Sequence, residues 1–224
     1  MNLCINYIDS EVTLSFDYIT SIEIENKQLF YHLVNDFNLI SQGNLIEDIC
    51  MFENNIEINM SNKFFTVIDY FNLDLNNKKI LSNLYKFLIE NIEEKEYLKL
   101  NQCYDKIVSI ITKVSNNTVL PIEINNEFDL EIMMKLLKIS VAPKNKLIDT
   151  LFLLIDIYKE FNIKQIITLI NIKQVLEKEE IIELYKYAVY NQVMLFLIDY
   201  GYYGVSLTNE KKIIIDNNLE EFVL

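Results

Sequence analysis

Four carboxylates gather within nine residues of the chain, where an extended segment is followed by a predicted helix. They are Glu123, Glu127, Asp129 and Glu131. Calcium takes about six to eight oxygen ligands, often carboxylates and backbone carbonyls of irregular turns, so this segment is a candidate metal site, although its spacing is not that of an EF-hand. The same residues also fit an ordinary helix start, because acids complement the amino end of the helix dipole and Glu131 can pair with Lys135 one turn later.

Lysines follow directly after these acids, with no acid between them. They are Lys135, Lys138, Lys144 and Lys146. The first two are three residues apart and share a helix face, whereas the last two follow Pro143. Such a group can contact a phosphate backbone, but the same lysines can equally form a solvated surface that binds no ligand.

The charge composition restricts how the chain can recognise an anion. It has 33 acidic and 20 basic residues, a formal net charge of −13. All 20 basic residues are lysines, so the planar, two-pronged recognition of phosphate or guanine by arginine is excluded. The single histidine, His32, lies in a predicted helix without clustered partners and is interpreted as a helix-surface residue.

The sequence lacks the motifs of the common enzyme classes. Its three glycines, Gly43, Gly201 and Gly204, do not form a phosphate-binding loop, so nucleotide hydrolysis is not expected. Asn171 and Asp199 end predicted strands, where a nucleotide hydrolase would hold a metal-binding acid, and we interpret them as remnants or caps. A nucleophilic triad that uses histidine as its base is not expected, because His32 is the only histidine. We therefore expect that the protein is not an enzyme.

The predicted elements indicate an α/β domain built from both ends of the chain. Short apolar runs and one helix over 27–42 fill residues 1–60, and strands alternate with helices over 143–224, a pattern typical of parallel strands with crossover helices. Residues 61–142 have a helical period, with helices predicted over 61–71, 77–92, 93–114 and 129–139 and an extended run between the last two. The two ends should pack together, with a helical excursion between them.

The distribution of apolar residues and cysteines predicts a cytoplasmic protein. The longest apolar run, from Leu151, is interrupted by Asp156, so no transmembrane segment is expected, and the amino-terminal residues do not resemble a secretory signal. The three cysteines, Cys4, Cys50 and Cys103, are odd in number and widely spaced, which indicates reduced, buried thiols rather than a disulfide framework or a zinc site.

Several long stretches resemble one known family. They are FNLDLNNKKILSNLYKFLIENI, the acidic run leading to FDLEIMMKLLK, and the stretch from LFLLIDIYKEFNIKQ to NQVMLFLIDY. These resemble the short form of the accessory spacer-acquisition protein of type II-A CRISPR systems. The likeness covers nearly the whole chain and depends on the order and apolar pattern of the elements rather than on one motif.

The resemblance implies a non-catalytic protein with a degenerate P-loop-NTPase-like α/β head without a phosphate loop, and an inserted helical leg. It implies a ring-shaped homotetramer that holds calcium, admits double-stranded DNA ends into a central hole, and assists the CRISPR integrase and effector proteins. The calcium-bearing acidic segment of the family matches the region of the four carboxylates above. Lysine alone would line the hole.

These inferences combine into one functional hypothesis and two alternatives. The hypothesis is a protein that binds duplex DNA without reading its sequence, because backbone contacts by lysine carry no sequence information. The first alternative is an acidic interaction scaffold, or a mimic of DNA, that engages a basic partner and has no affinity for duplex. The second is a nucleotide-driven enzyme, which would require ATP turnover.

Overall fold

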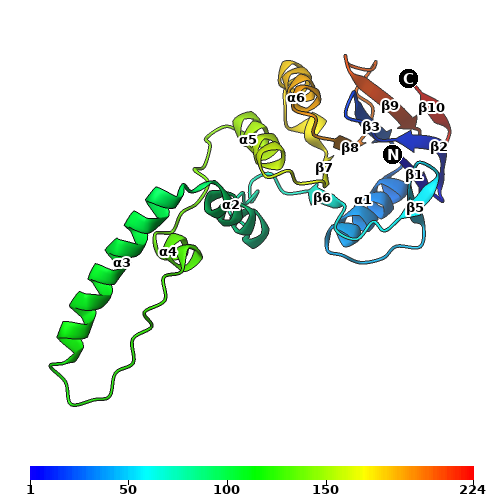
Figure 1. Cartoon of the computed structure of the whole chain (residues 1–224). Helices are drawn as coiled ribbons and strands as arrows, with labels where there is room; N and C mark the ends of the chain where they lie inside the picture. Colours follow the sequence, from blue (N-terminus) through cyan, green and yellow to red (C-terminus); the bar gives the residue numbers. More distant parts are fainter. The chain divides into compact units, whose positions relative to one another are not determined.

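The computed structural model describes residues 1–224 and divides them into two compact units. The head comprises residues 1–74 and 143–224, and the leg comprises residues 75–142 (Figure 1). The sequence-based boundary at residue 60 therefore lies before the first break between the units, which falls after Asp74. Each unit has a core of its own.

A six-stranded sheet forms the centre of the head. Its strand order is β10-β9-β3-β8-β7-β6. The bounds are β3 Ile19–Ile24, β6 Phe64–Val67, β7 Ile166–Ile170, β8 Leu195–Tyr200, β9 Glu210–Ile215 and β10 Glu221–Val223. All neighbouring strands are parallel except β10, which pairs antiparallel with β9. Helices cover the parallel strands, so every residue of β3 and β7 is buried, including the polar Thr20, Ser21 and Glu23 of β3.

Three helices accompany this sheet, and Figure 1 shows α1 on one side of it and α5 and α6 on the other. Their bounds are α1 Lys27–Ser41, α5 Leu147–Glu160 and α6 Lys178–Asn191. Asn26 caps α1 by accepting hydrogen bonds from the amides of Gln28 and Leu29. Phe37 on the buried face of α1 packs its ring 5.1 Å from that of Phe64 and 5.2 Å from that of Phe196.

A second, four-stranded antiparallel sheet has the order β2-β1-β4-β5. The bounds are β1 Asn2–Ile5, β2 Ile8–Thr13, β4 Ile49–Glu53 and β5 Ile56–Ile58. Side chains alternate along β1 and β4, so that Leu3, Ile5, Ile49 and Met51 enter the head core while their neighbours face outward. The separate antiparallel sheet was not predicted from the sequence.

The leg contains three helices: α2 Lys78–Asn91, α3 Glu94–Ser115 and α4 Leu130–Leu136. Its small core is formed by Tyr85, Leu130 and Met134, with Phe128 and Leu100 packed against them. The Tyr85 hydroxyl donates to the carbonyl of Ile139 at 3.2 Å. Asn76 and Val141 exchange two hydrogen bonds of 3.0 and 2.7 Å, which ties the two ends of the leg together.

Most predicted elements are present, but one predicted helix is wrong. The helix predicted over 61–71 is absent, and β6 occupies its centre as an edge strand of the large sheet. A short apolar run such as KFFTVI cannot be assigned to helix or strand by period alone, and here pairing with β7 decides the outcome. The extended run predicted over 118–124, in which Pro121 indicates an edge strand or a connector, pairs with no strand and is a connector. None of the helices combines the length and apolar character that crossing a bilayer requires.

Candidate nucleic-acid interface

The four carboxylates of the predicted metal site do not converge in the folded chain. Glu123 and Glu127 lie exposed in the segment between α3 and α4. Asp129 caps α4, where its Oδ1 accepts a hydrogen bond of 2.9 Å from the amide of Ile132. Glu131 forms an ion pair with Lys135. No three His, Cys, Asp or Glu residues of the structure are grouped to hold a metal ion, so the residues of one chain do not fit a calcium site.

The four predicted DNA-binding lysines divide between the two units. Lys135 and Lys138 belong to the leg, whereas Lys144 and Lys146 belong to the head. The Lys135 ammonium lies 2.6 Å from Glu131, and its hydrogen bond to that carboxylate raises the pKa of Lys135. The other three are exposed and form no ion pair, and Lys138 follows α4 by two residues, with a left-handed φ of 53°. Lys135 therefore has a neutralising partner that the other three lack.

A lysine stripe that the sequence analysis did not identify runs along α3. Its members are Lys95, Lys99, Lys106 and Lys113. The spacings are four, seven and seven residues, so on a helix with about 3.6 residues per turn they lie within about 40° of one another. All four are exposed, and none forms an ion pair. The stripe extends for about 27 Å along the helix axis.

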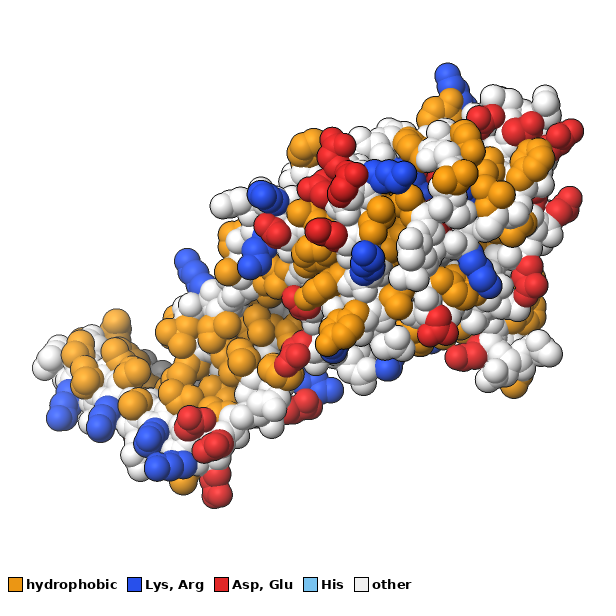
Figure 2. Space-filling model, turned by 90° about the horizontal axis from the view of Figure 1, so that it is seen from above, with side chains coloured by type: hydrophobic (Ala, Val, Ile, Leu, Met, Phe, Trp, Pro, Cys, Tyr) orange, Lys and Arg blue, Asp and Glu red, His pale blue; other side chains and the backbone are white.

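The acids of α3 do not neutralise this stripe. Glu94 and Glu96 occupy the first turn, where they complement the helix dipole, and Asp105 projects from a different side of the helix. Polar residues such as Gln102 and Ser109 lie beside the lysines. Figure 2 shows the lysines of the leg along one edge, with hydrophobic side chains gathered elsewhere on this unit. The stripe is thus a local concentration of positive charge on an acidic protein.

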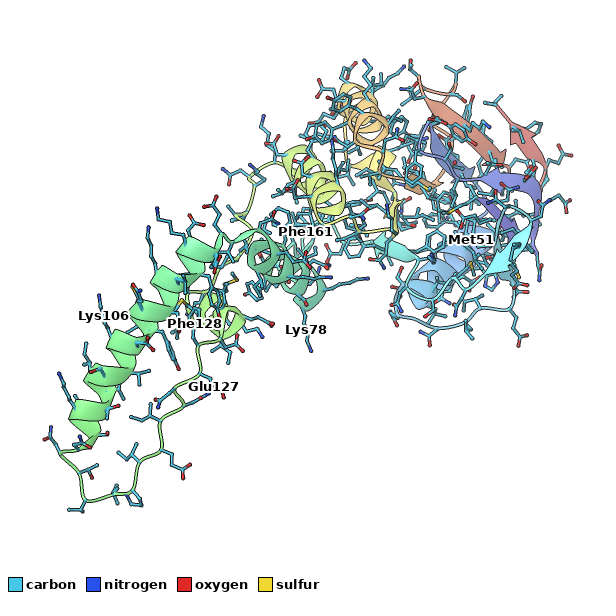
Figure 3. All side chains as sticks on the ribbon, in the orientation of Figure 1. Met51, Lys78, Lys106, Glu127, Phe128 and Phe161 are labelled. Atoms are coloured by element: carbon cyan, nitrogen blue, oxygen red, sulfur yellow. The ribbon has the colours of Figure 1, made fainter.

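The other side of α3 carries an apolar seam with the three- and four-residue spacing of a coiled coil. Its members are Tyr97, Leu100, Tyr104, Ile107, Ile111 and Val114. The first half is covered within the leg, because the rings of Tyr97 and Tyr104 lie 5.3 and 5.6 Å from that of Phe128 (Figure 3). The second half is open: Ile107, Ile111 and Val114 are 54%, 50% and 62% exposed. No residue of α3 is buried.

The head contains a buried ionic cluster that was also not predicted. Lys173 donates to Glu23 at 2.8 Å and to Glu210 at 2.5 Å, and Lys212 lies 2.7 Å from Glu23. Tyr185 adds a hydrogen bond of 2.9 Å to Glu210. Burial alone would lower the pKa of Lys173, but the two carboxylates outweigh it and raise the pKa. The four charges balance, which is how buried ions are tolerated.

Glu23 and Lys173 of this cluster lie near the carboxyl ends of β3 and β7, where open α/β sheets commonly bind ligands, whereas Glu210 begins β9. A cavity of about 240 Å³ there is lined in part by Lys173, Lys212 and Glu177. Glu177 and Glu180 form a capping box at the start of α6, so carboxylates already occupy the helix end that would otherwise attract a phosphate. Asn171 and Asp199 accept hydrogen bonds from the amides of Tyr200 and Lys173, which join the segments that end β7 and β8, and Asn171 makes no side-chain capping bond.

His32 has the surface position predicted from the sequence. Its imidazole is 52% exposed, lies 3.6 Å from Asp36 one turn later on α1, and packs against the ring of Tyr7 at 4.8 Å. Tyr7 donates a hydrogen bond of 2.7 Å to the same carboxylate. These contacts join α1 to the turn between β1 and β2.

A comparison with protein-family models matches residues 41–219 to the family described as CRISPR-associated protein (Cas_Csn2). The match covers about four-fifths of the chain and includes the entire leg and most of the large sheet. The resemblance found in the sequence is thereby confirmed. The chain belongs to the Cas_Csn2 family of accessory proteins of type II-A CRISPR systems, whose role is in CRISPR adaptation.

Proposed function

We propose that this protein binds the ends of double-stranded DNA, without reading their sequence, inside a ring of four copies, and so assists the CRISPR integrase and effector proteins in acquiring new spacers. The observation that carries the proposal is the lysine stripe of α3. Four unpaired ammonium groups in line are suited to the phosphates of a duplex, since such contacts supply most sequence-independent affinity. Lysine presents point charges, so the contacts position DNA rather than identify bases.

The net charge of −13 is compatible with this proposal, because surface carboxylates repel DNA phosphates only over short distances in salt. At physiological salt the Debye length is about 8 Å, so carboxylates elsewhere on the surface are screened from a duplex that touches α3. Cyclic symmetry would repeat the stripe in every subunit, so that the copies face one duplex together. A modest positive surface on one chain thereby becomes a substantial one in the assembly.

The open half of the apolar seam supports assembly with further copies of the chain. Ile107, Ile111 and Val114 continue a seam whose first half is already packed, and a second amphipathic helix is the partner that this spacing fits. We propose that a second copy of the chain covers them. The lysine stripe lies on a different side of α3, so it would stay available to DNA in such an assembly.

Calcium is a further part of the proposal. The acids of one chain do not complete a site, and Asp129 and Glu131 already have partners. Additional oxygen ligands would therefore have to come from a neighbouring copy. We further propose that the head is a P-loop-NTPase-like fold that has lost its phosphate loop and has no catalytic activity. The capping box of α6 and the balanced ionic cluster support this, because carboxylates occupy the start of α6 and pair with Lys173 and Lys212.

The lysine stripe is tested by replacing Lys99, Lys106 and Lys113 with glutamine, which preserves helix propensity and removes charge. We expect binding of a linear duplex to weaken roughly 10- to 100-fold near 0.1 M salt, and the slope of log affinity against log salt to flatten by about 0.9 for each lost phosphate contact. A gel-shift titration at several salt concentrations measures both.

The matched control replaces three exposed helical lysines of the head, Lys27, Lys178 and Lys186, with glutamine. The net charge changes equally, so a control that loses the same affinity would show a general charge effect. Unchanged binding and slope in the α3 variant would refute the assignment of the stripe. Absence of duplex binding by the unaltered protein would favour the acidic scaffold.

A further inference from the structure

Two of the three cysteines face each other across neighbouring strands. In the antiparallel pairing of β1 with β4, Cys4 lies directly opposite Cys50. The residues on either side of each cysteine point into the head core, so the two thiols share the outer face of the small sheet. Cys4 is exposed and Cys50 is partly exposed, which corrects the prediction of buried thiols. Cys103 is on α3, in the other unit.

The position of this pair in the hydrogen-bond ladder determines its spacing. The amide of Asn6 donates to the carbonyl of Asp48, the residue opposite it, at 2.8 Å. Hydrogen-bonded and non-hydrogen-bonded pairs alternate along an antiparallel ladder, so Cys4 and Cys50, two residues further on, form a hydrogen-bonded pair. The Cα atoms of such a pair are about 5.5 Å apart, and disulfides span Cα separations of about 4.4 to 6.8 Å.

The surroundings leave the thiols able to react. The register between β1 and β2 shifts opposite Cys4, where β2 contains the extra residues, so the regular ladder is interrupted on that side of Cys4. Glu57 on β5 lies diagonally across from Cys50 on the same face. Burial, followed by the charge and hydrogen bond of Glu57, raises the pKa of Cys50. Cys4 is therefore the better placed thiol for a first reaction with solvent.

We infer that Cys4 and Cys50 form a reversible thiol–disulfide modification site whose oxidant is a low-molecular-weight disulfide. The Cys4 thiolate attacks one sulfur of the small disulfide, forms a mixed disulfide and releases one small thiolate. The Cys50 thiolate then attacks Cys4 Sγ, closes the protein disulfide and releases the second small thiolate. The two protein thiol protons end on the two small thiols, and the two electrons lost by the cysteines reduce the small disulfide.

The bond should be easily reduced again. The Cβ atoms of directly opposed residues lie about 4.5 to 5.5 Å apart, at the wider end in hydrogen-bonded pairs, whereas a disulfide requires about 3.5 to 4.5 Å. Closing the bond therefore draws the two strands together, and strained disulfides are the more reducible ones. The site is suited to a reversible modification rather than to a permanent structural link.

The experiment treats the full chain with oxidised glutathione and then maps the products by mass spectrometry without reduction. We expect loss of the mass of two hydrogen atoms, a cross-link between the peptides containing Cys4 and Cys50, and full reversal by dithiothreitol. Cys103→Ser should form the same cross-link. Cys4→Ser and Cys50→Ser should give only glutathione adducts. The serine variants at these outward-facing positions should keep the circular dichroism spectrum of the unaltered chain.

Two further measurements separate this site from chance pairing. Glu57→Gln should close the disulfide several-fold faster, because it removes a carboxylate that keeps Cys50 protonated. In denaturant, oxidation should lose its preference for the Cys4–Cys50 pair. The inference would be overturned by a folded chain that yields only mixed disulfides, that links Cys103 to either partner, or that forms the cross-link between separate chains.

Discussion

Whether a lysine of this protein can bind an external anion depends on its exposure and on whether an acid is paired with it. Lys135 is held 2.6 Å from Glu131, whereas the lysines of the α3 stripe have no acidic partner. Lys173 and Lys212 are buried and balanced by Glu23 and Glu210, so they contribute to the head and are not available to an external anion. Only unpaired and exposed lysines can exchange their counterions for DNA phosphates.

Asp199 provides a prediction at the scale of one residue. It is fully buried, its Oδ2 has no hydrogen-bond partner, and burial, opposed in part by Lys173, raises its pKa to about 7. The folded chain therefore holds a proton here that the unfolded chain releases near pH 4. Stability contributed by this group is fully present below about pH 4 and falls as pH rises to about 7, by roughly 1.4 kcal/mol per unit of pKa difference.

The measurement is chemical denaturation of the unaltered chain and of Asp199→Asn across this pH range. The variant cannot ionise at this position, so its free energy of unfolding should fall less steeply between about pH 4 and pH 7, and the two curves should run parallel above that range. Equal slopes in both proteins throughout would show that Asp199 does not titrate in the folded state.

At the scale of elements, α3 is distinctive because no part of it is buried although it is the longest helix. We predict that Ile107→Asp with Ile111→Asp reduces the assembled protein to smaller species, since charges in the seam would have to be desolvated on assembly. The fold of one chain should change little, because both side chains are about half exposed. Sedimentation velocity measures the assembly state.

The control for this variant adds the same two charges on another side of the helix, as Gln102→Asp with Ser109→Asp. Both positions are exposed and lie outside the seam. If the seam variant sediments like the unaltered chain, α3 is not part of the interface between copies. If both variants dissociate, the cause is added negative charge rather than the seam.

Elements were easier to predict from the sequence than contacts. Helices such as α3 and α6 follow from their apolar period, and apolar runs identified β7 and β8. The stripe of α3 is present in the spacing of its lysines, but the sequence does not show which of these lysines form ion pairs in the folded chain. The ionic cluster joins Glu23 to Lys173 and Lys212, far apart in the chain, so only the pairing of β3 with β8 and β9 brings them together.

The four carboxylates of the predicted metal site lie apart within one chain. Four carboxylates close in sequence looked like one site, yet an extended segment spreads Glu123 and Glu127 along its length, and helix capping and an ion pair engage the other two. Proximity in the chain implies convergence only where a turn folds the residues back on themselves. Residues 121–129, which carry Glu123, Glu127 and Asp129, contain no such turn.

At the scale of the whole molecule, the proposed function requires an acidic chain to enclose a polyanion and to contact it through exposed lysines. Enclosure makes a prediction that surface binding does not, because a closed ring can load only onto a duplex with an accessible end. The affinity for DNA should therefore depend on topology as well as on length and salt. A flat lysine surface would bind linear and circular duplexes alike.

The most direct measurement compares binding to a linear duplex and to a covalently closed circle of the same sequence, each with calcium and with chelator. We predict tight, salt-sensitive binding to the linear form and much weaker binding to the circle, with linearisation of the circle restoring affinity. Equal affinity for both forms would contradict enclosure of DNA ends, and no affinity for either, with or without calcium, would contradict duplex binding altogether.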